Sequence, residues 1–189
     1  MVAVSTVQDV RPYFQEHVSA AMRSVDVDTR EETAGYLVGL LADFVLVPDE
    51  PNLDAPLASV LSWALSGRPD ERVNRMRCLG DLALFRCGFF PDQLERRGVD
   101  ERYAAALGGR AYDAVASGDR RASDTVNGLA ASEVFAELAA RFLLFAQVLD
   151  EVRERTAMQT HSELTRMYTR YRMGGSPRLA RRLARRGLC

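Results

Sequence analysis

The chain has 189 residues, of which 47% are hydrophobic and 27% charged, and its formal net charge is -1. This balance is typical of a globular protein with its own core and excludes wholesale disorder. All 25 basic residues are arginines, so chemistry that needs a lysine, such as Schiff-base formation or a P-loop lysine, is excluded.

Apolar residues recur every three or four positions, and no segment shows the period-two alternation of a strand, so the sequence predicts an all-α fold. Pro12 suits the first turn of a helix that continues to Val25. Asp28 is expected to cap a second helix, with Glu31 at the capping-box position, and this helix is expected to continue to Val45.

Prolines mark the next boundaries along the chain. The stretch 47–56 contains three of them and is expected to be a loop, because proline removes a backbone donor and clashes with the preceding turn. A short helix is predicted over 60–65. A longer one is predicted from Pro69 to about Cys87, where Gly88 ends or bends it.

A helix of one to two turns is predicted from Pro91 to Arg97, and Asp100 is a plausible N-cap for the helix that follows it as far as Val115. The segment 117–128 is the most polar and least periodic part of the chain. We therefore expect an exposed or mobile loop there.

Ser132 is expected to start the most apolar helix, which extends to Thr156 and is the candidate for the centre of the core. A further helix is predicted over 160–173, ended by a Gly-Gly-Ser-Pro break. The sequence thus predicts a single-domain bundle of about seven to nine helices, with a helical domain over 1–173 and a short basic helical tail over 174–189.

Motifs for metals, cofactors and phosphates are missing. His17 and His161 lack the spacings of helical metal sites, and no standard glycine-rich phosphate loop occurs. Cys78, Cys87 and Cys189 form no paired framework, which favours a reducing cytoplasm. No apolar run indicates a signal peptide or a membrane span. The sequence therefore predicts no metal, no cofactor and no catalytic residues, and leans away from an enzyme.

Asp81 is the most informative single residue, because it lies in an otherwise apolar helical segment. Its carboxylate is expected to reach the core, where an unpaired charge is very costly. Arg77, Arg110 or Tyr112 is expected to be its partner. The favoured interpretation is that Asp81 is a hydrogen-bonded anchor between helices. There are two alternatives: Asp81 is a ligand-binding or catalytic acid with a raised pKa, or its side chain is exposed.

Glycines accompany this aspartate inside the helical pattern, at Gly80, Gly88, Gly108 and Gly109. A glycine inside a helix costs about 1 kcal/mol relative to alanine. The sequence therefore predicts that the backbones of neighbouring helices approach closely at these positions, or that the helices are capped or bent there.

The same region carries the patterns LGDxxLF, GFF and GGxAY, formed with a few residues between them by Leu79, Gly80, Asp81, Leu84, Phe85, Gly88, Phe89, Phe90, Leu94, Arg96, Val99, Asp100, Tyr103, Gly108, Gly109, Ala111 and Tyr112. This set resembles the signature of a family of uncharacterised bacterial all-helical proteins. Tyr168, Gly175, Ser176 and the segment from Arg178 to Leu183 extend the resemblance over most of the chain. It implies no activity, and Ala104 stands where the resemblance leads us to expect a second tyrosine.

Charge is strongly polarised along the chain. Residues 1–71 hold 12 acids and 4 arginines, a net charge of -8, whereas residues 151–189 hold 3 acids and 10 arginines, a net charge of +7. This asymmetry predicts electrostatic contact within the protein, with a second copy or with a partner. The tail is an amphipathic basic segment whose candidate interaction residues are Arg178, Arg181, Arg182, Arg185 and Arg186.

Three functions remain open from the sequence. The first is a non-enzymatic helical protein-interaction or regulatory module, with a homodimer as one form. The second is a small-molecule or lipid-binding pocket, enzymatic or not. The third is a nucleic-acid regulator that uses the tail, although the near-neutral net charge of the protein disfavours nucleic-acid binding. The candidate pocket residues are Asp81, Phe85, Phe89, Phe90, Tyr103, Arg110 and Tyr112.

Overall fold

The structure, a computed structural model, describes residues 10–46, 55–122 and 126–156, and all regular secondary structure in these ranges is α-helical. The predicted all-α fold class is therefore confirmed. The chain divides into two compact units, residues 1–152 and residues 153–189. The predicted boundary at residue 173 and the basic tail lie outside the described residues. Among the described helices, none combines the length and apolar character needed to cross a membrane.

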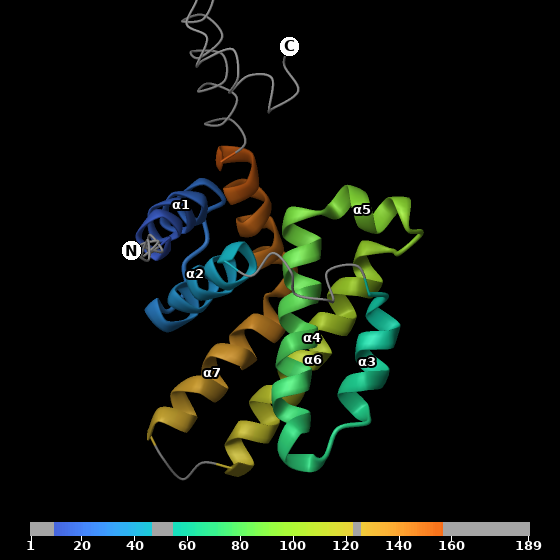
Figure 1. The fold of residues 1–189 in the computed structure, drawn as a ribbon. Helices are drawn as coiled ribbons and strands as arrows, with labels where there is room; N and C mark the ends of the chain where they lie inside the picture. Colours follow the sequence, from blue (N-terminus) through green and yellow to red (C-terminus); the bar gives the residue numbers. More distant parts are fainter. Residues whose placement is uncertain (1–9, 47–54, 123–125, 157–189) are drawn as a thin grey trace, which may run out of the picture. The chain divides into compact units, whose positions relative to one another are not determined.

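Figure 1 shows the helices in chain order. The helices are α1 (Arg11–Ser24), α2 (Glu31–Leu46), α3 (Leu57–Leu65), α4 (Pro69–Phe89), α5 (Pro91–Arg96), α6 (Glu101–Ala122) and α7 (Val126–Ala140), followed by the helical stretch 142–156. Local signals in the sequence place several helix ends. Proline is the first residue of α4 and of α5. The Asp100 carboxylate caps α6 by accepting hydrogen bonds from the backbone N–H groups of Arg102 and Tyr103, at 2.7 and 3.4 Å.

Two predicted boundaries are wrong. The polar segment 117–128 is helical in its described part, because α6 continues to Ala122 and α7 begins at Val126. Ser132 therefore lies inside α7 rather than at its start, and its buried hydroxyl donates a hydrogen bond to the carbonyl of Ala116 at 2.9 Å. Tertiary packing has extended helices through residues whose polarity indicated a loop.

Two further expectations also need correction. Because α2 begins at Glu31, Arg30 rather than Asp28 occupies its N-cap position, and the Arg30 carbonyl accepts the hydrogen bond from the Ala34 N–H at 3.0 Å. The long apolar helix expected over 132–156 is interrupted by a turn at Arg141.

Helices α4 and α6 lie side by side, and glycines permit their close approach (Figure 1). A Cβ atom added at Gly80 would lie 2.6 Å from the Cε1 atom of Tyr112. One added at Gly108 would lie 2.5 Å from the ring of Phe142 and 2.8 Å from the Cβ of Ala83. Real Cβ atoms do not approach other atoms this closely, so glycine is required for this packing. The prediction of close backbone approach is confirmed at both positions.

The same rule holds at both ends of α4. Gly88 lies against the helical stretch 142–156, where a Cβ would overlap the Cβ of Leu149 and lie 3.0 Å from the carbonyl oxygen of Ala146. Gly118 of α6 leaves room for the side chain of Val73, whose Cγ2 would lie 2.7 Å from an added Cβ. Helix α4 is thus held closely along its length.

A methyl group at Gly88 is expected to destabilise the fold. The variant Gly88→Ala should lower the free energy of unfolding by about 1–3 kcal/mol, since overpacking against a backbone carbonyl cannot be relieved by rotating a side chain. The matched control is Gly39→Ala in α2, where no described atom lies within 4 Å of the added Cβ. That variant should be more stable by roughly 0.5–1 kcal/mol. Urea denaturation measures both, and a Gly88→Ala protein as stable as the parent would contradict the packing argument.

A carboxylate joins the beginning of α2 to α7. Glu137 accepts hydrogen bonds from the hydroxyls of Thr29 and Thr33, each at 2.7 Å, and from Arg141 at 2.8 Å. Arg141 also donates to the carbonyl of Asp28 at 2.7 Å. Burial alone would raise the pKa of Glu137, but the three hydrogen bonds outweigh it and lower that pKa below the ordinary value of 4.5.

Replacing this carboxylate should cost stability in a pH-dependent way. Glu137→Gln is expected to lower the free energy of unfolding by about 1–3 kcal/mol at neutral pH. Because the folded-state pKa is lowered, the contribution of Glu137 is present above pH 4.5 and is lost as the pH falls through the lowered value.

Thermal and chemical denaturation from neutral to acid pH test this expectation. The control Glu133→Gln removes an exposed ion pair with Arg30 and should change stability far less than Glu137→Gln does. Equal losses for the two variants, or a Glu137 effect that does not diminish in acid, would refute the assignment.

Candidate functional site

Asp81 lies at the point where three helices meet. Its Oδ1 atom accepts a hydrogen bond from the hydroxyl of Tyr36 of α2 at 2.5 Å and another from the hydroxyl of Tyr112 of α6 at 2.8 Å. Tyr112 is completely buried, and its ring packs against Gly80, the residue before Asp81. One carboxylate oxygen on α4 therefore binds α2 and α6 together.

The second oxygen has a weaker contact. The Nε atom of Arg77 lies 3.6 Å from Oδ2 of Asp81, which is an ion pair but is too long for a good hydrogen bond. The Arg77 side chain is 50% exposed and that of Asp81 is 18% exposed. The Arg77 guanidinium also lies 5.9 Å from the centre of the Tyr36 ring.

Burial dominates the protonation of this cluster. It raises the pKa of Asp81, although hydrogen bonds from Tyr36 and Tyr112 and the charge of Arg77 act in the opposite direction. Burial also raises the pKa of both tyrosines, and the neighbouring Asp81 carboxylate adds to that effect. The two phenols therefore stay protonated at ordinary pH and act as hydrogen-bond donors.

Two of the three partners proposed from the sequence are found beside Asp81, namely Arg77 and Tyr112. Arg110 is exposed, and in the described part of the chain it forms no hydrogen bond or ion pair with Asp81. Sequence analysis missed Tyr36. Its only sequence signal was that a tyrosine near the core needs a partner for its hydroxyl, which does not identify the partner.

The phenylalanines proposed for a pocket form a separate stack. The ring of Phe85 lies parallel to that of Phe44 of α2, with 4.1 Å between centroids, and it also stacks on Phe89 at 5.0 Å. Phe90 meets Phe85 edge to face at 5.5 Å. Phe85 is buried, so this part of the set belongs to the core.

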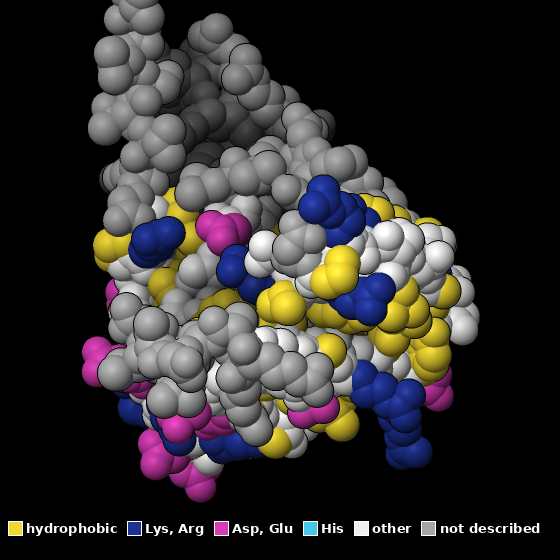
Figure 2. Space-filling model, turned by 90° about the horizontal axis from the view of Figure 1, so that it is seen from below, with side chains coloured by type: hydrophobic (Ala, Val, Ile, Leu, Met, Phe, Trp, Pro, Cys, Tyr) yellow, Lys and Arg dark blue, Asp and Glu magenta, His cyan; other side chains and the backbone are white. Residues whose placement is uncertain are grey.

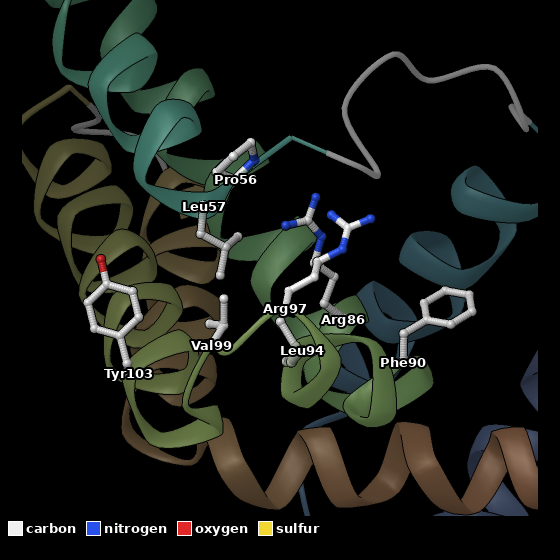
Figure 3. A pocket seen from close by; sticks show the side chains of 8 residues that line it. All are labelled: Pro56, Leu57, Arg86, Phe90, Leu94, Arg97, Val99 and Tyr103. Atoms are coloured by element: carbon white, nitrogen blue, oxygen red, sulfur yellow. The ribbon is translucent and has the colours of Figure 1, made fainter.

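Phe90 and Tyr103 instead line an apolar groove of about 390 Å³ where α3, α4, α5 and α6 come together. In Figure 3, Leu57, Val99 and Leu94 lie between Tyr103 on one side and Phe90 on the other. Phe90 is 36% exposed and Tyr103 is 52% exposed. The groove-lining residues are Pro56, Leu57, Arg86, Phe90, Leu94, Arg97, Val99 and Tyr103.

A second concavity, of about 360 Å³, lies beside Asp81 between α2 and α4. It is lined by Arg11, Gly35, Tyr36, Val38, Gly39, Leu40, Asp43, Arg77 and Asp81. The seven candidate pocket residues are thus divided among the Asp81 cluster, the phenylalanine stack and the groove, with Arg110 in none of them. The candidate arginines of the tail lie outside the described residues.

In the described ranges, no three His, Cys, Asp or Glu side chains gather in an arrangement that suits a metal ion. Comparison of the chain with models of protein families, with curated proteins and with solved structures finds no match.

The hydroxyl of Tyr36 should contribute measurably to stability. Tyr36→Phe keeps the ring but removes one donor from the Asp81 carboxylate, so the free energy of unfolding should fall by about 1–3 kcal/mol. The control Tyr103→Phe removes a half-exposed hydroxyl and should change stability by no more than about 0.5 kcal/mol. Denaturant titrations of the two variants measure the difference, and a neutral Tyr36→Phe would contradict the anchoring role of Asp81.

Proposed function

We propose that the protein is a helical protein-interaction module and that the groove beside Phe90 and Tyr103 is its docking surface. The observation that carries this proposal is the exposure of these two aromatic side chains at opposite sides of one apolar groove. Single exposed hydrophobic residues are common on proteins, but large aromatics that share one concave surface are typical of binding sites.

The composition of the groove also favours a protein partner. Aromatic residues and arginine are enriched at the energetic centres of protein interfaces, and the groove holds both kinds. Leu57, Leu94 and Val99 provide an apolar floor between the aromatics (Figure 3). A partner that inserts an apolar side chain there would remove this apolar floor from water.

Charge indicates what else the partner carries. Both charged residues that line the groove, Arg86 and Arg97, are cationic. Arg86 is buried and Arg97 is exposed, so the Arg97 guanidinium is the one that can donate hydrogen bonds to a partner's carboxylate, in addition to its existing contacts. We therefore propose as partner a protein segment that combines an apolar anchor residue with an acidic one.

Figure 2 shows one face of the molecule, on which hydrophobic side chains gather over the right-hand part and side chains of both charges are spread around them.

Three related proposals depend on sequence more than on this groove. Membership of the bacterial family that the LGDxxLF, GFF and GGxAY residues resemble remains a proposal, as does a role of the arginine-rich tail in binding a partner or nucleic acid. A cytoplasmic location is proposed because Cys78, Cys87 and Cys189 are not spaced as a paired cysteine framework in the sequence.

A photo-crosslinking amino acid at position 103 tests the docking surface in the full-length protein. We expect it to capture one predominant protein from the native cell extract. The same crosslinker at Tyr13, which is 45% exposed on α1, is the matched control and should not enrich that protein. The captured protein is then purified, and its affinity is measured for the parent, Tyr103→Glu and Tyr13→Glu.

Tyr103→Glu should weaken binding about 10- to 100-fold, because it places an acid in the aromatic part of the groove and opposes an acidic partner. Tyr13→Glu should leave the affinity unchanged. Identical capture at both positions, or equal affinities for both variants, would refute the groove as the docking surface. Capture of a second copy of this chain would replace the proposed partner with a homodimer.

A further inference from the structure

The concavity between α2 and α4 differs from the groove in its chemistry. Its walls hold two cations, Arg11 and Arg77, and two acids, Asp43 and Asp81. Val38 and Leu40 supply the apolar part. Charges of both signs around one small hollow are complementary to a ligand that also carries both signs.

Gly35 and Gly39 leave the concavity open. Both belong to its lining, and no described atom lies within 4 Å of the Cβ that a larger residue would carry. The space beside the glycines of α4 and α6 is occupied by a neighbouring side chain or backbone, as at Gly80 and Gly88. In the described part of the chain, the α2 glycines instead create space beside the Asp81 carboxylate.

The two oxygens of Asp81 give the concavity a directional acceptor. Oδ1 accepts hydrogen bonds from the hydroxyls of Tyr36 and Tyr112, whereas Oδ2 forms a 3.6 Å ion pair with the Nε atom of Arg77. A carboxylate oxygen has about two lone-pair sites, so Oδ2 can accept a further hydrogen bond from a cationic donor. Arg77, half exposed at the same wall, can turn a donor toward an anionic group.

We infer that this concavity binds an α-amino acid with an apolar side chain. The ammonium group donates to Oδ2 of Asp81, and the carboxylate pairs with the Arg77 guanidinium. Arg77 and Asp81, an i,i+4 ion pair with 3.6 Å between Nε and Oδ2, present a cation and an anion side by side, as the two neighbouring charges of an α-amino acid require. The volume of about 360 Å³ lies near the lower end for small-molecule sites and suits a single amino acid.

Binding is tested by NMR titration of the full-length protein with L-leucine. Two single-charge analogues provide the ligand controls: 3-methylbutylamine lacks the carboxylate, and 4-methylpentanoate lacks the ammonium group. Leucine should shift resonances around Asp81 and bind at least about tenfold more tightly than either analogue. The absence of saturable binding by leucine and by other apolar amino acids, or equal binding of the amine alone, would overturn the inference.

Two variants locate the site. Gly39→Leu fills the concavity without replacing a charged residue and should weaken leucine binding by at least about tenfold. Ala114→Leu adds the same side chain at an exposed position of α6 and should bind leucine like the parent. Melting temperatures show that both variants are folded. Unchanged binding by Gly39→Leu would refute this location, and because Tyr103 and Phe90 are untouched, this outcome is independent of the proposed docking groove.

Discussion

The relative placement of α2, α4 and α6 depends on one shared acceptor, the Oδ1 atom of Asp81. Two phenol hydroxyls from α2 and α6 converge on it, so the three helices have one relative register in which both hydroxyls have their acceptor. Three consecutive residues of α4 serve this junction. Leu79 is buried in the core, Gly80 admits the ring of Tyr112, and Asp81 accepts its hydroxyl. Apolar contacts alone tolerate a shift along the helix axis, whereas this arrangement does not.

Sequence predicted the features that local chemistry determines. Pro69 begins α4 and Asp100 caps α6, because a fixed φ angle and a side-chain acceptor act within one turn of the helix. The errors lie where distant contacts decide. The polar segment after Ala116 remains helical because Ser132 and Val73 pack against α6, and neither contact is visible in the local pattern.

The candidate site was predicted in part for the same reason. Asp81 was identified as a buried acid that needs partners, and Tyr112 was among those expected. Tyr36 was missed because it is separated from Asp81 by 45 positions in the chain, and its role depends on how α2 approaches α4. The proposed pocket set was treated as one cluster, but helical spacing alone does not tell which aromatic rings turn inward, like Phe85, and which turn toward the groove, like Tyr103.

The contrast between two helix pairs explains why concavities occur where they do. Helices α4 and α6 approach through glycines, and the space between them is filled. Helices α2 and α4 are instead bridged by large side chains. Tyr36 donates a hydrogen bond to Asp81, and the ring of Phe44 stacks on that of Phe85. Long bridges hold two backbones apart, and glycines on α2 leave the intervening space open. The same anchor that fixes the register therefore also exposes a carboxylate oxygen to a hollow, which links the stability of the bundle to a surface that can bind a ligand.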